Sequence, residues 1–105
     1  MAGMSYRLES AVERNMRSDG TFEILDEIKR RSLKAGDYAK LIFVQDDPPA
    51  PGERMWVEVV SVSGGGYVGR LKNKPSCVAG LAWGDLVEFE PWHVVDIERR
   101  ADGEA

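Results

Sequence analysis

The pattern of hydrophobic and polar residues changes its period near residue 36. Over residues 7–17, apolar side chains recur at near-helical spacing with charged residues between them, which predicts an amphipathic helix. These apolar residues are Leu8, Ala11, Val12 and Met16. Asp26 suits the N-cap of a second short helix over Glu27–Leu33. We expect these one or two helices, within residues 7–35, to pack on the structure that follows, although a partner-binding arm is an alternative.

From Gly36 onward the apolar positions alternate with polar ones, which indicates β-strands. Five strands are expected, over residues 37–44, 54–63, 67–72, 85–90 and 94–98. Their inward side chains are expected to be Leu41, Phe43, Val57, Val59, Leu71, Val87, Phe89, Val95 and Ile97. The Pro-rich acidic segment Gln45–Glu53 predicts a loop, because proline cannot donate a hydrogen bond within a central strand.

The glycine triplet Gly64–Gly66 predicts a tight β-hairpin turn, because glycine readily adopts the positive φ angles of such turns. With all three glycines in the loop, Val59 lies opposite Leu71 and Glu58 opposite Lys72. This register gives an apolar pair on one face and an ion pair on the other, as cross-strand energetics favour. A strand rather than a helix follows the triplet, so it does not predict a phosphate-binding loop.

Together these elements predict a mainly β fold, α+β overall, in a single domain over residues 1–105. Residues 36–98 form its β core and residues 99–105 a frayed tail. One arrangement is a small SH3-like five-stranded barrel, which closes its own strand edges. The other is a strongly curved antiparallel sheet with the helices on one face.

Composition narrows the classes of function. The 105 residues carry a net charge of −4, which argues against a general nucleic-acid-binding surface. No apolar run is long enough for a membrane helix, and the N-terminus has no apolar signal region. The single cysteine indicates a reducing compartment. We therefore expect a cytoplasmic protein that does not enter a membrane.

Candidate chemistry is sparse. His93 and Cys77 are the only histidine and the only cysteine, and they form a catalytic pair only if the fold brings them together. His93 as a turn cap and Cys77 as a small buried residue are the favoured interpretations. One histidine and one cysteine are too few for a structural zinc site, and Asp46, Asp47 and Glu53 lack the spacing of a calcium loop. The sequence predicts no catalytic residues, no metal and no cofactor.

Several aromatic and charged residues are expected outside the core and form the candidate partner surface. They are Trp56, Glu58, Tyr67, Arg70, Lys72, Trp92 and His93. Aromatic side chains on one side of a small barrel make a groove for extended peptides. They also stack nucleic-acid bases when cations such as Arg70 and Lys72 follow the phosphate backbone. The alternative is that the N-terminal helices cover Trp56 and Trp92.

Four stretches also carry a family resemblance, and they span about Phe22 to Ile97. They read GDYAKLIF, GERMWVEVVSV, GYVGRLKNKP and GDLVEFEPWHVVDI. In combination they resemble the bacterial YegJ-like family, whose domain has no established function. The resemblance implies a small, mostly β, bacterial domain, and it implies no activity, substrate or cofactor.

The sequence favours a non-catalytic protein-interaction or accessory module, with self-association as a special case. The alternative is a nucleic-acid-binding SH3-like barrel that uses Arg70, Lys72 and Lys74 together with exposed aromatic residues. An enzyme is the least favoured class, because it requires a pocket with a perturbed titrating group.

Overall fold

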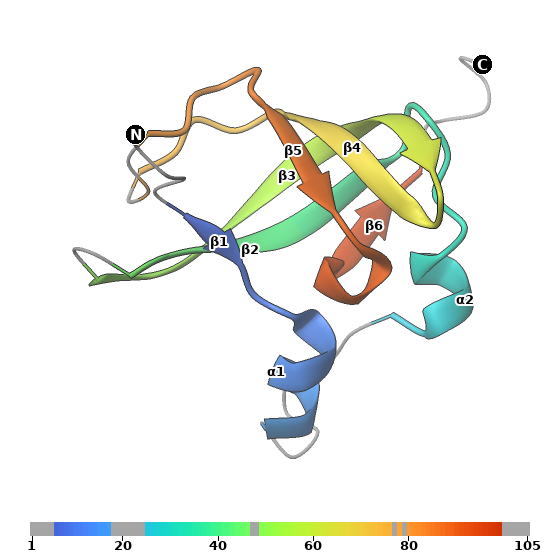
Figure 1. The fold of residues 1–105 in the computed structure, drawn as a ribbon, viewed down its shortest axis with the longest axis horizontal. Helices are drawn as coiled ribbons and strands as arrows, with labels where there is room; N and C mark the ends of the chain where they lie inside the picture. The colour runs from blue at the N-terminus through green and yellow to red at the C-terminus, as the bar shows by residue number, and fades with distance from the viewer. Residues whose placement is uncertain (1–5, 18–24, 47–48, 77, 79, 100–105) are drawn as a thin grey trace.

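The protein forms one strongly curled antiparallel sheet with a few short helices (Figure 1). The structure is a computed structural model that describes residues 6–17, 25–46, 49–76, 78 and 80–99. Its elements are β1 (Arg7–Leu8), α1 (Ala11–Arg17), α2 (Glu27–Arg30), β2 (Tyr38–Asp46), β3 (Pro49–Ser63), β4 (Gly66–Leu71), β5 (Leu86–Phe89), the 3₁₀ turn η1 (Pro91–His93) and β6 (Asp96–Glu98). The strand order is β1-β2-β3-β4-β5, with β6 also paired to β2. The curled sheet confirms the predicted mainly β class and is consistent with a small SH3-like barrel.

The concave side of the sheet holds the core. The inward residues expected from strand alternation are buried there, namely Leu41, Phe43, Val57, Val59, Leu71, Val87 and Phe89. At the C-terminal end Ile97 packs against the core as expected, but Val94 rather than Val95 is the fully buried valine where the chain leaves η1. Ile42 is also fully buried although it was expected to face outward. It packs beside Gly52, where an added Cβ would lie 2.9 Å from the Ile42 Cγ2 atom.

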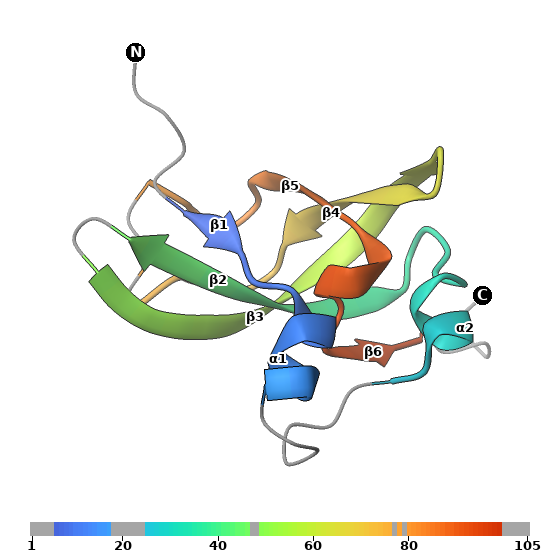
Figure 2. The same ribbon diagram turned by 60° about the horizontal axis from the view of Figure 1, so that its bottom comes forward.

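Two segments from opposite ends of the chain share one edge of β2. β1 pairs antiparallel with the Phe43–Val44 end of β2, and β6 pairs antiparallel with its Tyr38–Lys40 end. The Val95 N–H donates to the Lys40 carbonyl at 2.9 Å and continues this ladder. β1 and β6 therefore follow one another along β2 as one strand made of two pieces (Figure 2).

The Pro-rich segment is not the loop that the sequence predicted. β2 continues to Asp46 and β3 begins at Pro49, so the two strands form a long hairpin arm. β4 pairs with β3 only from Val57 onward, and this arm therefore lies beyond the third strand. Proline is tolerated there because a strand edge does not require its N–H group. Asp47 and Pro48 lie outside the described residues.

The turn between β3 and β4 uses two glycines rather than three. Ser63 pairs with Gly66, and the intervening Gly64 and Gly65 have φ angles of 61° and 86°. Two consecutive positive φ angles are typical of a type I′ hairpin turn, whose twist matches that of the flanking strands.

The predicted register of this hairpin was wrong, because the two-residue turn and a β-bulge each shift it by one position. The register shifts between Val59 and Ser61. On the side of this bulge away from the turn, Val57 lies opposite Leu71. The bulge restores the apolar alternation on the inner face. The Glu58 carboxylate still lies 3.5 Å from the Lys72 ammonium, so this predicted ion pair forms diagonally between the strands.

The N-terminal helices are shorter than predicted. The chain is extended in β1 before α1 begins, because Arg7 and Leu8 pair with the edge of β2. Asp26 is the N-cap of α2 as predicted, and its carboxylate accepts the Lys29 N–H at 2.9 Å. α2 ends at Arg30, after which Leu33 enters the core. Both helices lie against η1.

Candidate functional site

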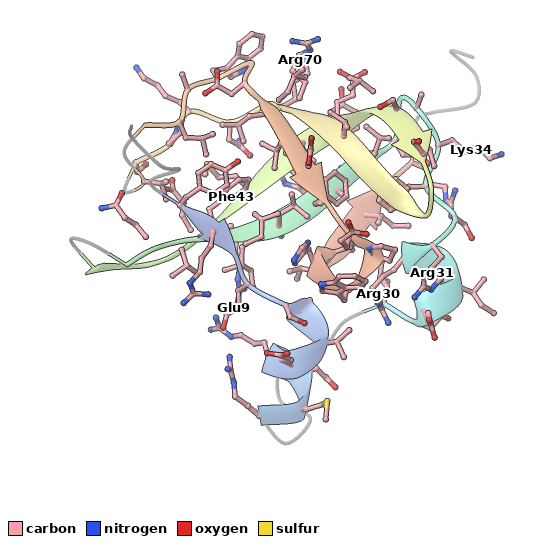
Figure 3. The ribbon with its side chains drawn as sticks, viewed as in Figure 1. Glu9, Arg30, Arg31, Lys34, Phe43 and Arg70 are labelled. Atoms are coloured by element: carbon pink, nitrogen blue, oxygen red, sulfur yellow. The ribbon has the colours of Figure 1, made fainter. Side chains whose placement is uncertain are left out.

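Four residues of the predicted partner surface lie together on the outer face of the sheet. Cross-strand pairing places Glu58 opposite Arg70, and Trp56 opposite Lys40. Following the register across the sheet gives one continuous row, Glu98, Tyr38, Glu58, Arg70 and Leu86. We call the face formed by Lys40, Trp56, Glu58, Arg70, Lys72 and Leu86 the outer face. Arg70 points away from the barrel at its upper edge (Figure 3).

Each of two tryptophans at this face lies under a lysine. The Lys40 ammonium lies 5.1 Å from the Trp56 ring centroid, and the Lys72 ammonium lies 5.0 Å from that of Trp83. Such cation–π contacts hold an indole ring in a preferred orientation. Trp83 is 59% exposed, and its side chain was not part of the predicted surface. The sequence did contain a signal for its exposure. Trp83 lies just before the Gly84-Asp85 turn, next to a strand that begins with the outward-facing Leu86.

Tyr67 does not belong to a partner surface. It is only 4% exposed and its ring stacks on Phe89 at 5.1 Å. Its hydroxyl donates to the Arg30 carbonyl at 2.8 Å and accepts the Leu33 N–H at 3.4 Å. Tyr67 therefore joins the segment after α2 to the core, and the expectation that it faces a ligand is corrected.

Replacing Tyr67 with phenylalanine is expected to lower the free energy of unfolding by about 1–3 kcal/mol, because a buried carbonyl loses its donor. Chemical denaturation measures this loss. Tyr38→Phe is the matched control, since Tyr38 is only half-buried, on the outer side of β2. Equal effects of the two substitutions would contradict the anchoring role of Tyr67.

Trp92 and His93 lie in η1, directly after β5. The His93 Nδ1 atom accepts the Glu90 N–H at 3.0 Å, which confirms the interpretation of His93 as a turn cap. The Trp92 ring lies 5.7 Å from the His93 ring and is 44% exposed, although α1 and α2 both contact η1. Trp92 therefore stays partly exposed beside the helices, and the Lys40 ammonium lies over the Trp56 ring.

Burial lowers the pKa of His93 below its ordinary value of 6.5, so the folded protein keeps the imidazole neutral. As the pH falls through 6.5, the unfolded chain binds the proton first, and the free energy of unfolding decreases until the folded histidine also protonates. We expect His93→Gln, which retains an acceptor for the Glu90 N–H, to lose this part of the pH dependence. Denaturation series between pH 7.5 and pH 5 measure the difference, and identical slopes would contradict it.

A groove runs between the two edges of the sheet, where the barrel does not close. It has a volume of about 510 Å³ and is lined by Tyr6, Arg7, Leu8, Leu86, Glu88 and His93. We call it the seam groove. At its base the Tyr6 ring contacts the Phe43 ring at 5.4 Å. Burial, and then the nearby carboxylates of Asp85 and Glu88, raise the pKa of the Tyr6 hydroxyl. The groove thus combines apolar walls with a negative potential on its β5 side.

Arg30 is a structural residue that the sequence did not single out. It is only 8% exposed, and its guanidinium donates to the carbonyls of Leu25 at 2.9 Å and Pro91 at 3.2 Å. It thereby links α2 to η1, beneath the barrel (Figure 3). A charged residue in a short helix is ordinarily solvated, and nothing in the local sequence distinguishes Arg30 from Arg31.

The described residues offer little for metal chemistry. Among them, no group of three or more histidine, aspartate or glutamate side chains could hold a metal ion. Cys77 lies outside the described residues, so its pairing with His93 stays untested. In the described part of the chain, every helix is too short or too polar to cross a bilayer.

Comparisons with protein-family models, with curated proteins and with solved structures find no match to this chain. The resemblance to the YegJ-like family therefore stays a prediction from the sequence motifs. The outer face and the seam groove are the two features from which a function is argued.

Proposed function

We propose that this protein is a non-catalytic protein-interaction module that binds its partner through the β5 end of the outer face. The observation that carries this proposal is the exposure of two large apolar side chains beside an arginine. Trp83 is 59% exposed and Leu86 is 58% exposed, and Leu86 lies directly opposite Arg70 in the sheet. Tryptophan and arginine are the residues that most often dominate the binding energy of protein interfaces.

The side chains of this surface are held in place before a partner arrives. The Arg70 guanidinium donates to the Gly84 carbonyl at 3.2 Å, and Lys72 is held both by Glu58 and by the ring of Trp83. A surface whose side chains are already ordered loses less conformational entropy on binding. This supports a role in recognition.

The remaining parts of the proposal follow the sequence. We infer a bacterial protein of the YegJ-like type that works in the cytoplasm, where a single cysteine stays reduced. The partner is a protein, and the module contributes binding rather than chemistry.

Affinity capture from the cell of origin, read by mass spectrometry, tests this function. We expect a reproducible protein partner whose recovery falls at least about tenfold with Trp83→Ser or Arg70→Glu, the loss expected of a central interface residue. Val62→Ser is the matched control, because Val62 is also apolar and 50% exposed but lies near the hairpin turn. Equal loss with Val62→Ser, or no reproducible partner, would contradict the proposal.

A nucleic-acid-binding barrel is the second candidate, because Lys40, Arg70 and Lys72 do gather on the face that carries Trp56 and Trp83. The carboxylate of Glu58 lies among these cations, which weakens attraction to phosphate.

We expect no binding of single-stranded RNA or DNA at low salt, where electrostatic binding is strongest. Fluorescence anisotropy with labelled oligonucleotides measures this. Binding that weakens steeply with salt and is lost with Arg70→Glu would favour the nucleic-acid alternative over a protein partner.

A further inference from the structure

Within the described part of the chain, one edge of β5 has backbone groups without a strand partner. The Leu71 N–H donates to the Asp85 carbonyl at 2.8 Å. This bond determines which residue pairs of the β4–β5 ladder are hydrogen-bonded. Hydrogen-bonded pairs alternate in an antiparallel ladder, so Val87 bonds to β4 while the N–H and C=O groups of Leu86 and Glu88 point the other way. Among the described strands, only β4 pairs with β5.

On the β1 side of the seam groove, backbone groups also point away from the neighbouring strand. The Glu9 N–H donates to the Ile42 carbonyl at 3.0 Å, so the alternation turns the backbone groups of Leu8 away from β2. Leu8 and Leu86 both line the groove. Within the described residues, the groove therefore lies between two strand edges whose outward backbone donors and acceptors have no strand partner, the arrangement to which an added strand binds.

The charges along β5 select the kind of strand that fits. Glu88 lines the groove, and the carboxylates of Asp85 and Glu88 both act on the Tyr6 hydroxyl, whereas the Glu90 carboxylate lies beside Gly66 of β4. Arg7 is the cation that lines the opposite wall. Glu88 is exposed, and within the described chain it forms no ion pair. Pairing of β5 with the β5 of a second copy would bring like charges together, which is unfavourable. A basic segment is complementary to this edge.

We propose that the seam groove binds an extended segment of a partner protein, which adds as a strand to the free edge of β5. The segment alternates apolar and basic residues. Its apolar side chains lie over Tyr6 and Leu8, and its basic side chains lie beside Glu88 on the outer side. This inference rests on the proposed function and specifies how the partner is held.

The probe is a pair of blocked seven-residue peptides, one alternating valine with lysine and the other valine with glutamate. We expect the lysine peptide to bind at least ten times more tightly than the glutamate peptide in a titration followed by NMR. We expect the amide protons of Leu86 and Glu88 to exchange rapidly in the unliganded protein and to slow down when the lysine peptide is bound. The Val87 amide, already bonded to β4, stays slow throughout.

Two substitutions at one position separate backbone pairing from charge. Glu88→Pro removes the outward N–H but leaves the ladder bonds of Val87 intact, and we expect it to abolish peptide binding. Glu88→Gln retains that N–H and is expected to weaken binding only severalfold. The amide-exchange pattern of the unaltered protein tests the same edge without any substitution.

Equal binding by the Glu88→Pro and Glu88→Gln variants would overturn strand addition, as would equal affinity for both peptides or no binding of either. If the captured cellular partner depends on Trp83 and Arg70 but is indifferent to Glu88→Pro, this inference fails while the proposed function stands. If no partner is captured at all, the proposed function fails instead.

Discussion

Replacing Gly69 with alanine is expected to destabilise the protein by about 2–3 kcal/mol, the upper part of the range for overpacking a well-filled core. Gly69 faces the interior in the middle of β4. A Cβ atom there would lie 2.7 Å from the Val57 Cγ2 atom, 2.9 Å from its Cβ atom and 3.1 Å from the Phe89 ring. Neither neighbour is free to move, because both are fully packed in the core. Chemical denaturation measures the loss.

Gly66 in the same strand provides the matched control. The nearest atoms to a Cβ atom at Gly66 would be those of the Glu90 carboxylate, at 3.2 Å, and the end of a partly exposed, flexible side chain can move aside. We expect Gly66→Ala to change the free energy of unfolding by less than about 1 kcal/mol, as is usual for substitutions away from the core.

A second substitution tests the cause of the Gly69 effect. Val57→Ala alone leaves a cavity, but combined with Gly69→Ala it removes the nearest atom that the new methyl group would meet, the Val57 Cγ2 at 2.7 Å, and leaves the Val57 Cβ at 2.9 Å. The double variant is therefore expected to be more stable than the sum of the two single effects predicts. Strict additivity, or equal effects of Gly66→Ala and Gly69→Ala, would show that close packing at Gly69 is not what makes alanine costly.

Replacing Phe43 with alanine is expected to cost about 3–5 kcal/mol, the range for removing a buried phenylalanine. The Phe43 side chain is fully buried near the β1 end of the sheet, and its ring supports Tyr6. Because total stabilities of domains are about 5–15 kcal/mol, this loss brings the protein near its unfolding threshold. Phe43→Leu, which retains most of the volume, is expected to lose much less.

Phe43→Ala is also expected to weaken the attachment of β1, which forms one wall of the seam groove. Leu8 pairs with Phe43 across the β1–β2 ladder, so the Glu9 amide, which bonds to the Ile42 carbonyl, should exchange faster in Phe43→Ala. Hydrogen exchange followed by NMR measures this local effect under conditions that keep the variant folded. An unchanged rate at Glu9 would mean that Phe43 stabilises the core without holding β1.

Strand alternation made the core and the outer face predictable. The inward position of Val57 and Val59 required Trp56 and Glu58 to face outward, and the structure places them so. Tyr67 was misplaced because its position beside the turn was given more weight than alternation. Counting back from Leu71 through Gly69 puts Tyr67 on the inner face.

Features that depend on pairing between distant segments were not predictable. The bulge near Val59 leaves no local signal, because it is favoured by packing across two strands rather than by its own residues. The seam groove depends on β1 joining β2, and Arg7 and Leu8 carry a helical pattern in the sequence. The buried position of Arg30 depends on two carbonyl groups, one of them in η1.

The pairing of β1 and β6 with the same edge of β2 has a consequence for the order in which the sheet assembles during synthesis. β1 is made first and β6 last, yet both complete the same row of hydrogen bonds. On the ribosome, the hairpins between β2 and β5 have their full sequences available while half of that β2 edge still lacks its neighbour. An unpaired strand edge attracts other chains. Because β6 is made after β2–β5, its part of the β2 edge is open to association with other chains until β6 has been synthesised.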